Sequence, residues 1–308
     1  MIDLLRRRIS MAVDTTPSDA IIIAKRSAND AALMNAIVAK GWVNSPKYMT
    51  KGEAEVITRV DFFLKGNTQV TNFDAFQFFT NVTIINYTEF EGCTNLVSLK
   101  IPSSVTAVEY SAFKNCSSLA LSELPSGVTS ISSYAFQNCS SLALTELPSG
   151  IKSIAESAFN NCSSLALTKL PSGVTSIGNS AFKNCSSLAL TELPSGVTSI
   201  SDYAFQNCSS LALTELPSGI KSIPYNGFRD CSNLAITEIP SSVTVIDAYA
   251  FWGCPKMTKV RIARTDSIVT GNALMFSDGI TIEVPNAFLE DYKVANGWSR
   301  YAKKMIGY

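Results

Sequence analysis

The chain has 308 residues, 46% of them hydrophobic, and its 25 Lys and Arg residues balance its 25 Asp and Glu residues. A neutral chain lacks the basic face that nucleic-acid binding needs, so we expect no nucleic-acid partner. The chain also lacks an apolar run of about 18 residues or more, so we expect no membrane-spanning helix.

The first 59 residues are expected to form an N-terminal segment and a helical cap. The basic run Arg6-Arg7-Arg8 is not followed by the apolar stretch and cleavage site of a secretory signal, so we expect synthesis in the cytoplasm. The run could contact phosphate, a membrane or an assembly partner, but a solvated terminus is the favoured interpretation.

Two helices and one strand are predicted within this cap. Residues 20–24 predict a short strand, and residues 29–40 predict a helix that Gly41 ends. A second helix is expected near Thr50, because Thr50 and Glu53 fit a capping box.

Residues 60–84 are rich in phenylalanine and predict degenerate repeats that lead into the next region. The residues concerned are Phe62, Phe63, Phe73, Phe76, Phe78 and Phe79. Such a group could form a ligand site, but a core between the cap and the following repeats is the favoured interpretation.

Residues 85–262 carry a cysteine every 23 residues, and these are all the cysteines of the chain: Cys93, Cys116, Cys139, Cys162, Cys185, Cys208, Cys231 and Cys254. A similar sequence pattern surrounds each cysteine, as in I-S-S-Y-A-F-Q-N-C-S-S-L-A-L-T-E-L-P-S-G-I-K-S from Ile131. A fixed period of this length predicts a solenoid of eight repeats, in which each unit stacks only on its neighbours.

Each position of the repeat has a predicted structural role. The aliphatic residues, the Ala-Phe pair and the Cys fill a narrow core. The residue before each Cys is Asn, Asp or Gly, which tolerate a left-handed backbone, so a one-turn helix should end there. In L-P-S-G-V we expect a type I turn with Pro second and Gly last, as in Pro125-Ser126-Gly127. One short strand should run into the Leu-Pro pair and another through V-T-S-I.

The even spacing of the cysteines is compatible with disulfides or with a column of core residues. Stacked neighbours would have parallel side-chain vectors and β-carbons about 4.8 Å apart, which is beyond the range of a disulfide. We therefore expect buried free thiols. No metal site is expected, because each coil offers one sulfur and no second ligand at local spacing.

The A-F-x-[NG]-C-x-x-L core, the [LI]-P-S-[SG]-V turn and the 23-residue period resemble the BspA-like leucine-rich-repeat family. Residues 263–308 resemble its end cap, with a strand at 279–284, a helix opened by Pro285-Asn286, and Trp298 and Tyr301 against a final helix. The resemblance implies a right-handed α/β solenoid of short parallel strands and one-turn helices. It also implies binding of other macromolecules, often at microbial surfaces or in phage-encoded proteins, and no catalysis.

One feature departs from the family pattern, which places apolar residues three, six and eight positions after the Cys. In six central repeats the apolar residues lie three, five and eight positions after the Cys instead. In a regular strand the fifth position would face outward and form an apolar stripe beside a column of charged residues. The stripe would be Leu121, Leu144, Leu167, Leu190 and Leu213 (then Ile236), beside Glu123, Glu146, Glu192 and Glu215 (with Lys169 and Glu238). A bulge that turns the fifth position inward is the favoured alternative.

A longer repeat is also present. Residues 111–154 and 180–223 differ only at Ser122/Thr191 and Ser133/Asp202, an offset of 69 residues. Exposed positions as well as core positions are nearly identical, which favours a spacer or a repetitive target over one sculpted pocket.

The sequence offers no support for catalysis. The chain has no histidine, no nucleotide-binding glycine motif and no calcium loop. We therefore expect no enzyme activity and no cofactor.

Three functional hypotheses follow. The first is an adhesin-like module that binds a protein or glycan surface, with exposed aromatic anchors at Tyr110, Tyr134, Tyr203, Tyr225, Tyr249 and Trp252. These rings could equally be surface residues that cover neighbouring coils. The second is a structural or decoration protein of a homo-oligomer or a larger assembly such as a phage virion, and the third is an enzyme with an unrecognised site. A virion or a microbial surface is the expected final location.

Overall fold

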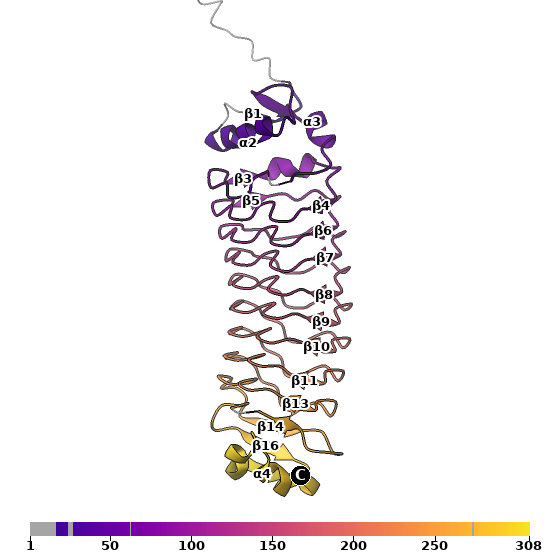
Figure 1. Cartoon of the computed structure of the whole chain (residues 1–308), viewed down its shortest axis with the longest axis vertical. Coiled ribbons are helices and arrows are strands. Elements are labelled where there is room, and N and C mark those ends of the chain that lie inside the picture. The colour runs from indigo at the N-terminus through magenta and orange to yellow at the C-terminus, as the bar shows by residue number, and fades with distance from the viewer. Residues whose placement is uncertain (1–16, 24–26, 62, 273) are drawn as a thin grey trace, which may run out of the picture.

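The computed structural model describes residues 17–23, 27–61, 63–272 and 274–308. It is a long parallel-strand solenoid with an N-terminal cap at one end and a strand-and-helix cap at the other (Figure 1). The predicted fold class is confirmed. The run Arg6-Arg7-Arg8, Ala24 and Phe62 lie outside the described residues.

The N-terminal cap contains β1 (Ala20–Ile23), α2 (Ala28–Ala39), β2 (Tyr48–Thr50) and α3 (Lys51–Glu55), and β1 pairs antiparallel with β2. The predicted helix is confirmed in α2, and Gly41 follows it with a φ of 69°. The predicted capping box is also confirmed: Glu53 N donates to Thr50 Oγ1 over 3.2 Å, and Thr50 N donates to Glu53 Oε2 over 2.9 Å.

The phenylalanine-rich segment forms solenoid coils that precede the first Cys. It contains β3 (Asn72–Phe73), the 3₁₀ helix η1 (Asp74–Phe78) and β4 (Ile84–Ile85). β3 pairs parallel with β5 (Ser98–Leu99), and β4 pairs parallel with β6 (Ala107–Val108). The core interpretation is confirmed for Phe63, Phe73, Phe76 and Phe79, which are buried and share ring contacts.

The V-T-S-I segments form the strands expected of them. They are β7 (Ser130–Ile131), β8 (Ser153–Ile154), β9 (Ser176–Ile177), β10 (Ser199–Ile200), β11 (Ser222–Ile223) and β13 (Val245–Ile246), and β15 (Thr270–Gly271) continues them. Behind them the phenylalanines form a stacked column, with ring centroids of consecutive coils 5.0–5.6 Å apart from Phe90 to Phe228.

The prediction of buried free thiols is confirmed for all eight cysteines. Each thiol donates to a carbonyl of the preceding coil, as Cys162 Sγ does to Phe136 O over 3.0 Å. Burial raises the pKa of the Cys162 thiol well above its ordinary value.

The residues from five to one before each Cys form what we call the turn face. The predicted left-handed residue before the Cys is confirmed (Asn138, φ 63°), but the residue five before the Cys is also left-handed (Tyr134, φ 62°). A run of overlapping turns therefore replaces the predicted one-turn helix. The N–H groups of Tyr134, Phe136 and Asn138 donate to the next coil over 2.8–2.9 Å.

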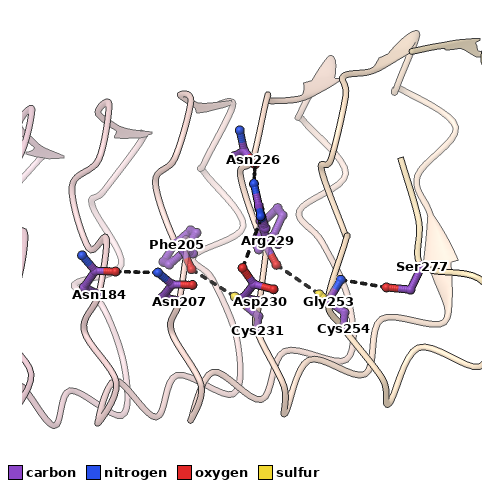
Figure 2. Close-up of polar contacts among 11 residues, drawn as sticks. Asn184, Phe205, Asn207, Asn226, Arg229, Asp230, Cys231, Gly253, Cys254 and Ser277 are labelled. Carbon is purple, nitrogen blue, oxygen red and sulfur yellow. Dashed lines mark hydrogen bonds and ion pairs between the residues drawn. The ribbon is translucent and has the colours of Figure 1, made fainter. Parts of the chain in front are cut away.

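A ladder of asparagine side chains runs along the turn face. Asn138, Asn161, Asn184 and Asn207 each donate Nδ2 to Oδ1 of the asparagine one coil before, over 2.6–2.7 Å. Figure 2 shows where the ladder ends: the next residue is Asp230, which is paired with Arg229 over 3.2 Å. A carboxylate has no N–H to donate, so the ladder stops there.

The proline turn lies one residue later than predicted. Val128 N donates to Pro125 O over 3.0 Å, so Pro125 is the first residue of the turn, not the second. The turn therefore begins after Leu124, which is buried, and ends at Val128, which is also buried.

The C-terminal cap is built on the sheet of β12 (Glu238–Ile239), β14 (Lys259–Ile262), β16 (Thr281–Val284) and β17 (Met305–Gly307). The predicted strand is confirmed in β16, and the predicted helices in η2 (Asn286–Phe288), α4 (Leu289–Val294) and the 3₁₀ helix η3 (Ser299–Lys304). Trp298 and Tyr301 are buried as expected, and Trp298 Nε1 donates to Val269 O over 2.7 Å. The strand β17 was not predicted.

The V-T-S-I strands fall into separate sheets with two seams, between β7 and β8 and between β10 and β11. Both seams precede a coil that reads G-I-K-S-I, and these two coils are 69 residues apart. At the second seam Pro224 follows β11 and has no N–H to donate.

Candidate functional site

The predicted outward leucine stripe is wrong. Leu144, Leu167, Leu190 and Leu213 have no exposed surface, so these side chains belong to the core and cannot contact a partner. Leu121, which is 7% exposed, is the one member of the predicted stripe that lines the groove described below. The inward orientation of the fifth position is confirmed, but the bulge predicted to produce it is not, because these segments form no strand in the coils from Cys116 to Cys208.

The reason lies in the two residues that follow each of these leucines. Thr145 and Glu146 are both exposed, while Leu144 before them and Leu147 after them are buried. A regular strand alternates its side chains and cannot place two consecutive ones outside. The strand predicted to run into the Leu-Pro pair is wrong for the coils from Cys116 to Cys208. Strands β5, β12 and β14 form at the two ends, where β12 pairs with the regularly alternating β14 although Thr237 and Glu238 are both exposed.

A groove of about 1120 Å³ runs along these segments from Gln77 and Ser98 to Glu192. Its apolar lining includes Leu124, Leu147 and Leu170, which are 6–9% exposed while the leucines three after each central Cys are fully buried. Prolines and serines of the P-S turns also line it. We call this surface the groove.

One charged residue per coil lies seven positions after each Cys, and we call this series the charge column. It consists of Lys100, Glu123, Glu146, Lys169, Glu192, Glu215, Glu238 and Arg261, all exposed. The residues from Lys100 to Glu192 line the groove, and Glu215 lies beyond it. Among the described residues, no ion pair engages Glu123, Glu146, Lys169 or Glu192, so their charges are available to a partner.

The main chain of the groove also has unused hydrogen-bonding capacity. The N–H groups of Thr145 and of the groove residues Glu146 and Leu147 have no hydrogen-bond acceptor within the described parts of the chain, and the same holds in the other coils between Cys116 and Cys208. Backbone donors are strong polar groups that bond to water when no protein group is available. A ligand in the groove could take the place of that water.

The predicted aromatic anchors are not among the residues that line the groove; they lie on the turn face or directly before it in the chain, in two clusters. Tyr87, Tyr110 and Tyr134 form one cluster, with ring centroids 5.3–5.4 Å apart; Tyr203, Tyr225, Tyr249 and Trp252 form the other, with separations of 5.4–6.4 Å. Lys114 lies over Tyr134 and Lys183 over Tyr203, at 5.7 and 5.0 Å from the ring centroids. Partner contact by Tyr134, Tyr203, Tyr249 and Trp252 stays a prediction.

Tyr134, Tyr203 and Tyr249 have left-handed backbones, with φ of 58–62°, which bulky residues rarely adopt. Ser111, Ser157 and Ser180 have the same conformation at the same position of other coils. The repeat geometry therefore imposes it, and the strain is not specific to the tyrosines.

Within the ranges that the structure covers, no three Cys, Asp or Glu side chains come together as metal ligands would. None of the helices it describes has the length and apolar character to cross a membrane.

Known proteins resemble the chain in its repeats. A family model described as BspA type leucine rich repeat region (6 copies) matches residues 67–189 and 152–283. No curated protein matches the chain.

Several solved structures are similar. A leucine-rich-repeat protein of T. pallidum is 34% identical over 50% of this chain and 72% of its own, with a TM-score of 0.44. A leucine rich cell surface protein of Faecalibacterium prausnitzii is 24% identical over 80% of this chain and 82% of its own (TM-score 0.37). The pneumococcal vaccine antigen PcpA is 17% identical over 74% of this chain and 66% of its own (TM-score 0.50), which concerns the fold alone.

Proposed function

Because the chain belongs to the BspA-type leucine-rich-repeat family, we propose that it is a non-enzymatic, adhesin-like protein that binds a protein partner through the groove. Repeat proteins of this type commonly act as binding scaffolds. The observation that carries the proposal is the groove itself, where an apolar lining, free backbone donors and unpaired charges meet on one surface.

The physical character of the groove supports this role. Protein interfaces combine an apolar centre with polar groups at the rim, and complementary charges select the partner. Here Leu147 and Leu170 supply apolar surface, and Glu146 and Lys169 supply charges of opposite sign one coil apart. The buried leucines behind them fix the groove on a packed core.

Charge reversal tests the proposal. In the groove variant E123K/E146K/E192K, three carboxylates of the charge column become ammonium groups. The control variant D266K/D278K/E290K makes the same net change in the C-terminal cap, where each acid forms one exposed ion pair. Proteins of a cell-surface extract are cross-linked to each chain and identified by mass spectrometry.

We expect a set of proteins that cross-links to the wild type and the control variant but not to the groove variant. If the two variants capture the same set, the groove is not the binding surface and the proposal fails.

A structural role in a larger assembly is the second candidate, and the 69-residue block repeat favours it, because it presents the same exposed residues twice along the solenoid. Measuring the mass of the purified chain in solution separates the two. A monomer favours the adhesin-like role, whereas a defined trimer or ring favours assembly.

A further inference from the structure

We propose that the occupant of the groove is an extended polypeptide segment that carries several Lys or Arg side chains. This inference rests on the proposed function and names the chemical class of its partner.

The sign of the charge column identifies the charge of the partner. Glu123, Glu146 and Glu192 line the groove, with Lys169 between them and Lys100 at its N-terminal end, so three carboxylates outnumber two ammonium groups. An anionic glycan or a nucleic acid would be repelled by this column, and a neutral glycan would leave its carboxylates unused. A partner with cationic side chains pairs with them instead.

A metal ion does not fit the same carboxylates. Consecutive coils are about 5.6 Å apart in the phenylalanine column, and each coil contributes at most one carboxylate to the charge column. Oxygen-ligated cations need several ligands about 2.0–2.6 Å from one point, which single carboxylates at this spacing do not supply. Long, flexible Lys and Arg side chains can reach one carboxylate each.

The main chain of the groove indicates that the partner is a polypeptide. The free N–H groups of Glu146 and Leu147, which line the groove, can take carbonyl acceptors, and the leucine and proline lining offers apolar contact. An extended polypeptide offers a carbonyl about every 3.3 Å together with both kinds of side chain.

The spacing of the coils sets the length of the segment. Glu123 and Glu192 are three coils apart, or about 17 Å at the 5.6 Å ring spacing of Phe136, Phe159, Phe182 and Phe205. About five residues of an extended chain cover that distance. The segment should therefore carry three basic residues within about six positions, with a neutral or acidic residue opposite Lys169.

Fluorescence anisotropy with a labelled 12-residue peptide of alternating Lys and Thr tests the inference. We expect saturable binding that the groove variant E123K/E146K/E192K weakens at least tenfold, since each rim charge contributes up to about a factor of five. K169E should strengthen binding two- to fivefold, because it makes the column continuous. The control variant D266K/D278K/E290K should bind within twofold of wild type, and the corresponding Glu-Thr peptide should not bind.

Two results would overturn the inference: no binding of the Lys-Thr peptide by the wild type, or an equal loss in the groove and control variants. Circular dichroism melting of each variant shows that a loss of binding is not a loss of fold. Should the cross-linking experiment still find groove-dependent proteins while the peptide fails, the proposed function stands and the basic-segment inference falls.

Discussion

The two sides of a single coil are held together in different ways. On the turn face, three N–H groups per coil donate to the next coil, and a phenylalanine column, a thiol column and an asparagine ladder reinforce them. In the Leu-Pro segment of the same coils, only one backbone hydrogen bond joins each described coil to the preceding one. An example is the bond from Ala143 N to Leu121 O, over 3.1 Å. Stability is therefore concentrated on one side, which leaves main-chain and charged groups of the other side free for a partner.

Alkaline pH should weaken the turn face most. Burial raises the pKa of seven thiols, from Cys116 to Cys254, and that of Cys254 to about 12. The unfolded chain loses these protons near pH 8.5, so the stabilisation is complete below that pH and decreases above it. The loss is about 1.4 kcal/mol per pH unit for each thiol.

Urea unfolding at pH 7.5, 8.5 and 9.5 measures this effect below the range where Tyr and Lys titrate. The variant C162A should show a smaller slope with pH than the wild type. A free energy of unfolding that stays constant up to pH 9.5 would contradict the prediction.

Replacing Leu144 by Glu should cost more than about 4 kcal/mol, because it removes a fully buried side chain and places a carboxylate in the core. The matched control is T145E at the adjacent exposed position, which should change stability by less than about 0.5 kcal/mol. Chemical denaturation of both variants measures the difference. Equal stabilities would mean that position 144 is solvated.

Interrupting the asparagine ladder should have an intermediate effect. Asn161 makes one ladder bond to each neighbour and has a φ of 62°, so N161A loses two hydrogen bonds and strains the backbone. We expect a loss of about 2 kcal/mol in thermal or urea unfolding. N161G loses the same bonds without the strain and should be the less damaging variant; if both lose equally, backbone strain is not part of the cost.

Extending the ladder should have the smallest effect. D230N replaces a carboxylate by an amide that can donate to Asn207, at the expense of an exposed ion pair with Arg229. A gain of about 0.5–1 kcal/mol is expected, and it should increase at high salt, where the ion pair is screened. A loss of stability at all salt concentrations would show that Arg229 contributes more than the ladder.

The sequence predicts much of this structure because the same residue types recur in every coil. Positions that recur in every coil, such as the Cys, the Phe and the left-handed Asn, have one structural solution, and the pattern identifies it. The left-handed Tyr134 was missed because Ser, Thr, Asn and Tyr share its position, so no residue type marks it. The strand β17 was missed because its three residues depend on pairing with β16 and not on local pattern.

The groove could be predicted only in part. The shift of a leucine from the sixth to the fifth position was visible, and so was the charge column that contains Glu146. Whether Leu144 faced inward depended on the backbone between two buried leucines, which alternation alone does not determine. The resulting loss of strand pairing, and the groove that follows from it, required the coordinates.

The seams between β7 and β8 and between β10 and β11 bear on how such a chain can lengthen. Each lies before a G-I-K-S-I coil, and the two are one 69-residue block apart. Inserting a further block at a seam would add three coils while both ends keep their present neighbours. Rods of graded length can thus arise by gene duplication alone, with no redesign of either terminus.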